Sequence, residues 1–304
     1  MKTAIIDVGG GLRGIYAAGV FDYLLENDIH FDILIGVSAG SANTMTYMAR
    51  QEGRLYDFYT KYSTRPEYMS VHNFLKSGSY IDMDYIYGTL SNSDGEYPID
   101  YETCLKSDSD LYVVATNAIT GRPVYFTMDD MDQDQYNPIK ASCSIPVVNK
   151  PYVINNIPYF DGALSDPVPI DKAFELGADK VVLILTKPVE FERKAAKDTA
   201  IASLMKDYPR AAAGLKNRAA QYNADVKRAL ELEKEGKLLI LSPDSIGQMK
   251  TLSRDNKMLH RLYLKGFNDA RDIDSFLGLD HTTRVQKRLE EARNEQNLLF
   301  AEED

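Results

Sequence analysis

The chain has 304 residues, of which 44% are hydrophobic and 26% are charged, proportions typical of a globular protein with one large domain or two ordinary ones. Its net charge of −10 argues against nucleic acid as a main partner and against strong electrostatic docking on anionic lipid, although a transient contact with a membrane surface stays open. Two cysteines are too few for a disulfide framework, and no apolar run has the length of a signal peptide or a membrane span, so we expect a cytoplasmic protein.

The first 50 residues predict two strands that alternate with two helices. Residues 4–8 are apolar and end at three glycines, as expected of a buried strand. Residues 12–26 carry apolar side chains at helical spacing, residues 31–37 form a second apolar run, and residues 41–50 are compatible with a helix. Two strands joined by a helix make a βαβ unit, whose strands are parallel.

The region from residue 56 to residue 87 is rich in tyrosine, and two interpretations of it stay open. We favour rings that pack in a core with their hydroxyls bonded locally, and the alternative is a cap over a site. Further strands are predicted over 111–118, 122–127, 152–154, 157–160, 180–186 and 237–241, and helices over 170–176, 190–236 and most of 249–298, with a break near Gly278 and a frayed end at 302–304. We expect one compact α/β domain over residues 1–304.

Residues 36–40 read Gly-Val-Ser-Ala-Gly and directly follow the second predicted strand. This pattern is typical of a nucleophile elbow, a sharp strand-to-helix turn that exposes one serine above the sheet edge. Gly36 and Gly40 leave room for the tight backbone around Ser38. An ordinary glycine-rich turn is the alternative interpretation.

A serine nucleophile needs a base, and histidine is the usual one. The chain has four histidines, none of them at a position typical of a catalytic histidine: His30, His72, His260 and His281. Asp161 is a second candidate, because it ends a predicted strand and is followed by glycine. Burial beside an apolar site would raise the pKa of this carboxyl and make it a better base. The alternative for Asp161 is a plain Asp-Gly turn.

Residues 9–14 read Gly-Gly-Gly-Leu-Arg-Gly and open the first predicted helix. Backbone N–H groups at a helix N-terminus can stabilise an oxyanion, and Arg13 adds a cation. Since the loops after parallel strands open on the same sheet edge, we expect this run beside Ser38. The run also matches the dinucleotide fingerprint, but that fingerprint needs an acid at the end of the second strand, and Asp32 stands at its start.

Two other features are discounted. Residues 130–134 resemble the start of a calcium loop, but Gln135 and Ala141 stand where the loop needs glycine and glutamate. Cys143 is interpreted as a packed thiol. We expect no metal and no cofactor.

Taken in order, the glycine run at 9–14, the elbow at 36–40 and Asp161-Gly162-Ala163 resemble the motifs of patatin-like phospholipases, and residues 141–146 resemble the segment that precedes the family's aspartate. The resemblance covers residues 1–190, while residues 191–304 look like the C-terminal part of bacterial members. It implies a three-layer α/β/α sandwich with a mainly parallel central sheet and extra C-terminal helices. Val147 and Val148 stand where the family often has an aromatic residue.

The resemblance also implies a catalytic mechanism. Ser38 would be the nucleophile and Asp161 the base of a dyad without histidine. The oxyanion hole would be built around Gly10 and Gly11 with Arg13 close by, and lipid acyl esters would be hydrolysed through an acyl-enzyme without a metal. Two alternatives stay open: a triad hydrolase that uses His260 or His281, and a non-catalytic lipid-binding or regulatory protein that retains the elbow. The sequence leaves the lipid and the oligomeric state open.

Overall fold

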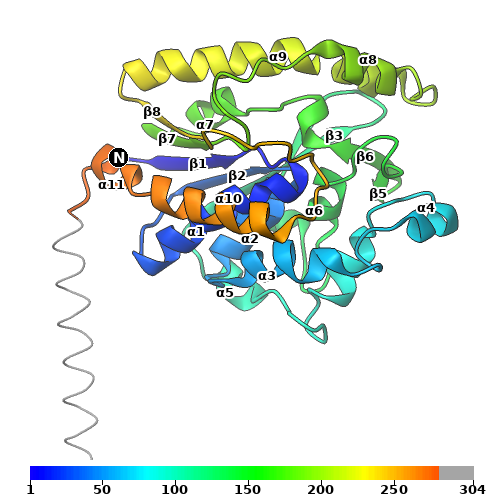
Figure 1. Cartoon of the computed structure of the whole chain (residues 1–304), viewed down its shortest axis with the longest axis horizontal. Helices are drawn as coiled ribbons and strands as arrows, with labels where there is room; N and C mark the ends of the chain where they lie inside the picture. The colour runs from blue at the N-terminus through cyan, green and yellow to red at the C-terminus, as the bar shows by residue number, and fades with distance from the viewer. Residues whose placement is uncertain (281–304) are drawn as a thin grey trace, which may run out of the picture.

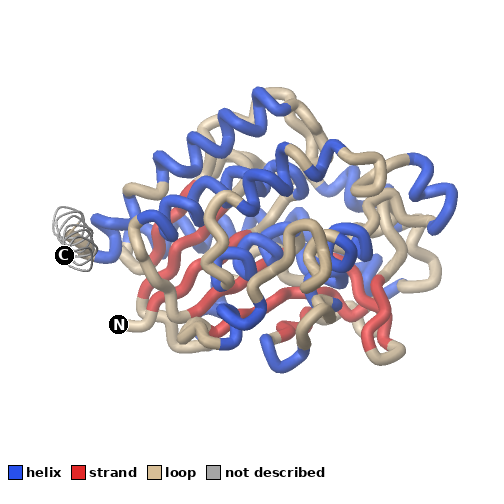
Figure 2. The backbone as a smooth tube through the Cα atoms, turned by 90° about the horizontal axis from the view of Figure 1, so that it is seen from below, coloured by secondary structure: helices blue, strands red, loops and turns tan. Residues whose placement is uncertain are grey.

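The computed structural model describes residues 1–280, which form a central sheet with helices on both faces (Figure 1). Within these residues, eight strands make one sheet in the order β5-β6-β3-β2-β1-β7-β8, with β4 paired to β3. The strands lie side by side in Figure 2. In chain order they are β1 (Thr3–Asp7), β2 (Ile33–Val37), β3 (Asp110–Asn117), β4 (Pro123–Phe126), β5 (Tyr152–Ile154), β6 (Ile157–Asp161), β7 (Lys180–Ile184) and β8 (Leu238–Leu241).

The sheet is parallel over five neighbouring strands and antiparallel at one end. The strands β3, β2, β1, β7 and β8 run parallel, whereas β4 and β6 pair antiparallel with β3, and β5 pairs antiparallel with β6. The predicted βαβ unit is confirmed, with Asp7 of β1 opposite Gly36 of β2. The carboxyl ends of the parallel strands therefore meet at one edge, where open α/β sheets bind ligands.

Helices cover both faces of this sheet and make three layers (Figure 1). Along β1 the side chains alternate, so that Ile5 joins one buried apolar cluster and Ile6 the other. The cluster of Ile5 includes α1 (Ile15–Glu26), α2 (Ala39–Met48) and α10 (Asn256–Asp269), and the cluster of Ile6 includes α7 (Ile170–Glu175) and α9 (Pro209–Lys234). The predicted α/β/α arrangement with a mainly parallel sheet is thus confirmed.

Several predicted boundaries differ from the structure. The predicted helix over 190–236 is two helices, because residues 203–208 form a turn between them that ends at Pro209. The helix predicted over 249–298 is also two, and the second is followed by Gly278 in a left-handed conformation with φ of 71°. The rest of that helix, His281 and residues 302–304 lie outside the described residues. The remaining helices are α3 (Arg54–Thr60), α4 (Val71–Ser77), α5 (Tyr101–Leu105), α6 (Asn137–Ser142), α8 (Ala195–Ala202), α11 (Asp272–Leu277) and the short η1 (Gly11–Gly14), η2 (Tyr62–Thr64), η3 (Tyr85–Thr89), η4 (Met128–Asp130) and η5 (Gly162–Leu164).

The tyrosine-rich region packs against the cluster that contains α1 and α2. Tyr59 and Tyr62 are buried in it, and the other tyrosines of the region are partly buried against it. None of the helices in residues 1–280 has both the length and the apolar content that crossing a membrane requires.

Candidate active site

Ser38 occupies a strained turn between β2 and α2. Its φ of 57° and ψ of −133° are rare for a residue with a side chain, and such conformations persist only where the surroundings hold them. Here the Ser38 N–H donates to the Ser142 hydroxyl at 2.9 Å, and that hydroxyl donates to the Val114 carbonyl at 2.6 Å. The Ser41 hydroxyl donates to the Ser38 carbonyl at 2.7 Å. Both sides of the turn are therefore fixed by buried serines.

The elbow also packs tightly against the end of β1. A Cβ atom added to Gly40 would lie 2.2 Å from the Asp7 carbonyl oxygen, a distance that no side chain can accommodate. Only glycine lets α2 begin this close to β1. The close contact between α2 and β1 therefore explains why glycine stands at position 40, as in a strand-to-helix elbow.

Asp161 faces Ser38 across one strand. Asp161 pairs with Ala115 of β3, and Val37 pairs with Val114 of the same strand, so Ser38 and Asp161 stand at the same level of the sheet. Two strand spacings separate their backbones by roughly 9–10 Å, a gap that two side chains can close. The Ser38 side chain lies close enough to the Asp161 carboxyl to favour its ionised form.

The environment of Asp161 opposes its ionisation. The residue is only 4% exposed, and burial raises the pKa of its carboxyl above the ordinary value. The Ser38 side chain, the hydrogen bond from the Ala163 N–H and the charges of Arg218 and Arg193 act in the other direction. The result is a buried carboxyl with a raised pKa beside the Ser38 side chain.

The glycine run lies against the elbow, as its position after a parallel strand predicts. Gly9 has a φ of 65°, and a Cβ atom there would lie 2.3 Å from the Val37 carbonyl oxygen. Its N–H donates to the Asp7 carboxylate at 2.8 Å. Within the described residues, the N–H groups of Gly10 and Gly11 donate to no acceptor. Two free backbone donors therefore stand in the loop that touches the serine turn.

A buried polar network that the sequence reasoning missed joins this loop to α2. Asp7 is 0% exposed and accepts from the Asn43 amide at 2.7 Å, while the Asn43 carbonyl accepts from the Tyr59 hydroxyl at 2.9 Å. Burial raises the pKa of Asp7 to about 7, against the lowering effect of the bonds from Gly9 and Asn43. In the sequence, the feature that indicates this network is Asp7, an aspartate that ends a buried strand just before a glycine run.

Arg13 follows the glycine run and is largely buried. It is 8% exposed, its Nη1 donates to the Thr251 hydroxyl at 3.3 Å, and its Nε has no partner. Burial, and then the charge of Arg193, lower the pKa of Arg13. The Thr251 carbonyl accepts from the Leu12 N–H at 2.8 Å, so a loop far along the chain fixes the start of η1.

An apolar cavity opens beside Ser38 on the α2 side of the sheet. Its walls come from the glycine run, from α2 and α3, and from the tyrosine-rich region. The lining includes Cys143, which is a packed thiol whose pKa burial raises to about 12. The lining residues are Gly11, Leu12, Ser38, Ala39, Ala42, Asn43, Arg54, Leu55, Phe58, Tyr59, Tyr68, Met69, Ile81, Met83, Ile86, Tyr87, Cys143, Ile145 and Leu252.

The three described histidines lie elsewhere. His260 is on α10, where its Nδ1 is 3.0 Å from the Tyr56 hydroxyl, and the Nε2 of His30 is 3.0 Å from the Ser109 hydroxyl. His72 is exposed on α4. Within residues 1–280, no three His, Cys, Asp or Glu side chains gather in a way that could hold a metal ion.

Comparisons with known proteins bear on this arrangement. The sequence matches the family model described as patatin-like phospholipase over residues 8–174, more than half of the chain, and a domain of unknown function (DUF6363) over residues 208–273. It is 30% identical over 192 residues to the uncharacterized protein YjjU of Escherichia coli (strain K12), a match that covers 62% of this chain and 52% of that protein. The chain thus spans about half the length of this relative. The crystal structure of VipD from Legionella pneumophila covers 90% of this chain and 67% of its own, with a TM-score of 0.46 and 14% identity.

Proposed function

The chain belongs to the patatin-like phospholipase family, and we propose that it is a serine-dependent lipid acyl hydrolase in which Ser38 and Asp161 form a catalytic dyad. The observation that carries this proposal is that Ser38 and Asp161 stand at the same level of the sheet on either side of β3, beside an apolar cavity. Ser38 is held in a strained turn, and burial raises the pKa of the Asp161 carboxyl, which makes it a better base.

The reaction follows from these positions. Asp161 takes the proton of the Ser38 hydroxyl while the oxygen attacks the ester carbonyl. The tetrahedral intermediate collapses, the alcohol leaves with the proton from Asp161, and Ser38 carries the acyl group. A water molecule then gives its proton to Asp161 and attacks the acyl-enzyme, which releases the fatty acid and restores Ser38.

The negative charge of the tetrahedral intermediate needs fixed donors. The unpaired N–H groups of Gly10 and Gly11 are the candidates, because their loop touches the elbow and Gly11 lines the same cavity as Ser38. Arg13 supports this loop from behind through Thr251. The bond from Gly9 to Asp7 keeps the loop in place before substrate arrives, so that little reorganisation is needed.

The cavity favours a lipid as the source of the ester. Most of its lining is aliphatic or aromatic, which suits an acyl chain and not a polar ester. Labelling with a fluorophosphonate probe tests the function directly, because only an activated serine reacts. We expect an adduct on Ser38 that is lost in Asp161→Asn. An unlabelled Ser38 in folded protein would instead favour a lipid-binding protein.

A further inference from the structure

The helix α4 carries an apolar stripe that faces solvent. Phe74 and Leu75 stand three and four residues after Val71, which puts the three side chains on one side of the helix. Such a stripe normally packs on a core, but α4 buries none of its residues, and these three are 66%, 44% and 80% exposed. Figure 1 shows α4 at the end of the molecule where β5 and β6 lie. The stripe is therefore an apolar surface that is open to a partner.

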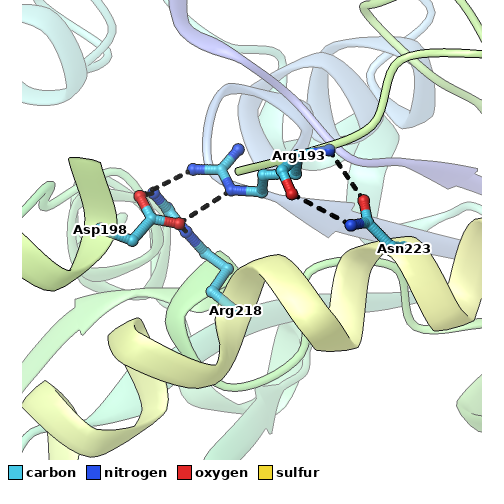
Figure 3. A network of polar contacts seen from close by, with 4 residues as sticks. All are labelled: Arg193, Asp198, Arg218 and Asn223. Carbon is cyan, nitrogen blue, oxygen red and sulfur yellow. Dashed lines mark hydrogen bonds and ion pairs between the residues drawn. The ribbon is translucent and has the colours of Figure 1, made fainter. Parts of the chain in front are cut away.

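The exposure of α4 contrasts with the position of α8, another short helix. Asp198 of α8 accepts from Arg193 at 2.9 and 3.1 Å and from Arg218 of α9 at 2.6 and 3.1 Å (Figure 3). Asn223 of α9 also holds the backbone of Arg193. Asp198 and Ala202 are buried, so contacts within the protein account for where α8 lies. The apolar stripe of α4 has no such burial to account for it.

Residues 146–150 lie against the base of α4 and extend this surface. The Tyr80 N–H, just after α4, donates to the Val148 carbonyl at 2.7 Å. The next residue back, Val147, is 48% exposed and has a φ of 70°, a conformation rare for a β-branched residue. Strained backbone of this kind gathers at active sites and at sites that bind ligands. What we call the α4 surface consists of Val71, Phe74, Leu75 and Val147.

The charged side chains beside the α4 surface are cationic. Residues 68–81 and 142–160 contain no aspartate or glutamate, although the whole chain has 45 of them and a net charge of −10. Lys76 is exposed on α4, and Lys150 lies against the end of this helix, because a Cβ atom added to Gly78 would lie 2.5 Å from the Lys150 Cε. Neither lysine forms an ion pair with any described residue. The local charge is thus opposite in sign to that of the chain.

The α4 surface is continuous with the wall of the apolar cavity. Met69 and Ile81 line the cavity and pair with each other where the segment that carries α4 leaves the wall. Ile145 lines it as well, two residues before Val147. An acyl chain that leaves a lipid layer at the α4 surface therefore has a short apolar path into the cavity beside Ser38.

We propose that the α4 surface docks on a lipid bilayer that carries anionic head groups. The apolar side chains enter the boundary between head groups and acyl chains, and Lys76 and Lys150 contact the anionic groups of the lipids. The inference goes beyond the proposed function, because it concerns where the protein meets a bilayer and not the reaction at Ser38. A second copy of the chain fits this surface less well, since two copies that met through it would bring their unpaired lysines together.

Co-sedimentation with vesicles tests the surface in Ser38→Ala, in which hydrolysis is switched off. This protein should bind vesicles of phosphatidylcholine with about 30% phosphatidylserine, and adding Phe74→Ser with Leu75→Ser should weaken the binding at least about tenfold. Leu204→Ser with Leu230→Ser is the matched control, because these leucines are also exposed but lie away from α4, and it should bind as before. Thermal melting checks that every variant folds.

The lysines have a test of their own. Lys76→Gln with Lys150→Gln should bind the phosphatidylserine vesicles about tenfold more weakly, since each cation near an anionic surface contributes about 1 kcal/mol. Lys227→Gln with Lys234→Gln, on α9, is the matched control and should change nothing. Equal binding to vesicles of phosphatidylcholine alone would overturn the anionic bilayer as the partner.

Two further outcomes would overturn the inference. One is equal vesicle binding with and without Phe74→Ser and Leu75→Ser, or no binding by either protein. The other is a dimer of the wild-type protein in analytical ultracentrifugation that these two substitutions dissociate, which would assign the surface to a second copy. The hydrolase is judged separately with p-nitrophenyl butyrate, a soluble ester that needs no bilayer. If butyrate is not released but vesicles are bound through α4, the hydrolase function fails and the docking surface stands.

Discussion

The Asp7 carboxylate accepts a hydrogen bond of 2.7 Å from the Asn43 amide, and both side chains are fully buried. Asp7 ends β1 and holds the N–H of Gly9, while Asn43 lies on α2, the helix that begins after Ser38. This pair therefore couples the glycine run to the elbow. Its geometry has consequences for stability and for catalysis.

Asp7→Asn should reduce the dependence of stability on pH. The pKa of Asp7 is about 7 in the folded protein and near 3.8 when unfolded, so the folded state retains a proton that the unfolded chain releases. This contribution is fully present below the unfolded pKa and is lost as pH rises through the folded pKa, at a cost of up to about 4 kcal/mol. Urea unfolding at about pH 5 and about pH 8 measures the difference. The assignment would be contradicted if the stability of Asp7→Asn fell as much between these pH values as that of the wild type. It would also be contradicted if the stability of the exposed control Asp94→Asn fell less than that of the wild type.

Ser38→Ala and Asp161→Asn should each lower hydrolysis of p-nitrophenyl butyrate by at least about 10³-fold, since the two residues act as a unit. Asn at position 161 can still accept from the Ala163 N–H, but it cannot take the proton of Ser38. Thermal melting checks that the variants fold. His260→Ala is the control, and a large loss of activity there would favour a triad over the dyad.

The rate should depend on pH through Asp161. The carboxyl must be ionised to act as a base, so kcat/KM should rise with pH. Because burial raises the pKa of this carboxyl, the acid limb of the profile should lie above the ordinary pKa range of an aspartate. Arg218→Met removes a charge that lowers this pKa and should move the acid limb to higher pH. Arg228→Met removes an exposed arginine of the same helix, paired with Glu231, and should leave the limb in place. An unmoved limb in Arg218→Met would argue against Asp161 as the titrating base.

Ser142→Ala should weaken the elbow. The Ser38 N–H would be left buried without its acceptor, at a cost of about 1–3 kcal/mol, and relaxation of the strained turn should lower kcat about 10-fold or more. Ser144→Ala is a matched control, because the Ser144 hydroxyl is also buried but bonds only the Lys140 carbonyl of the preceding helix, α6. Unfolding curves and butyrate release measure both effects. Equal losses in the two variants would mean that the elbow does not depend on the bond from Ser142.

Ala42→Phe should change the preference for chain length. Ala42 lines the cavity from α2, so a phenyl ring there occupies space that a long acyl chain needs. The ratio of kcat/KM for p-nitrophenyl dodecanoate over butyrate should fall at least about tenfold, while butyrate stays a substrate. Ala220→Phe, on the exposed side of α9, should leave the ratio unchanged. A ratio unaffected by Ala42→Phe would place the acyl chain outside this cavity.

Much of the fold is predictable from local patterns. The βαβ unit followed from two apolar runs around a stretch of helical spacing, and the hairpin of β5 and β6 followed from Asn155 and Asn156, which both adopt positive φ. Helix ends were harder to predict. A turn before Pro209 separates α8 from α9. The prediction joined the two helices because the charged and alanine-rich composition is equally helical on both sides of the turn. Helical propensity hardly changes across the turn, and the local signal is Pro209, because proline can begin a helix but not continue one.

The sequence alone determined the family, the fold class and the proposed dyad, because the elbow, the glycine run and the Asp-Gly turn are short patterns whose backbone conformations depend on nearby residues. Only the tertiary structure revealed the partners of these residues. The contacts between Asp7 and Asn43 and between Ser38 and Ser142 join distant parts of the chain. Hydrophobic periodicity says which face of an element is buried, but it does not say which polar groups meet there. Strand order and register decide which polar groups meet, and they place Ser38 and Asp161 opposite each other across β3.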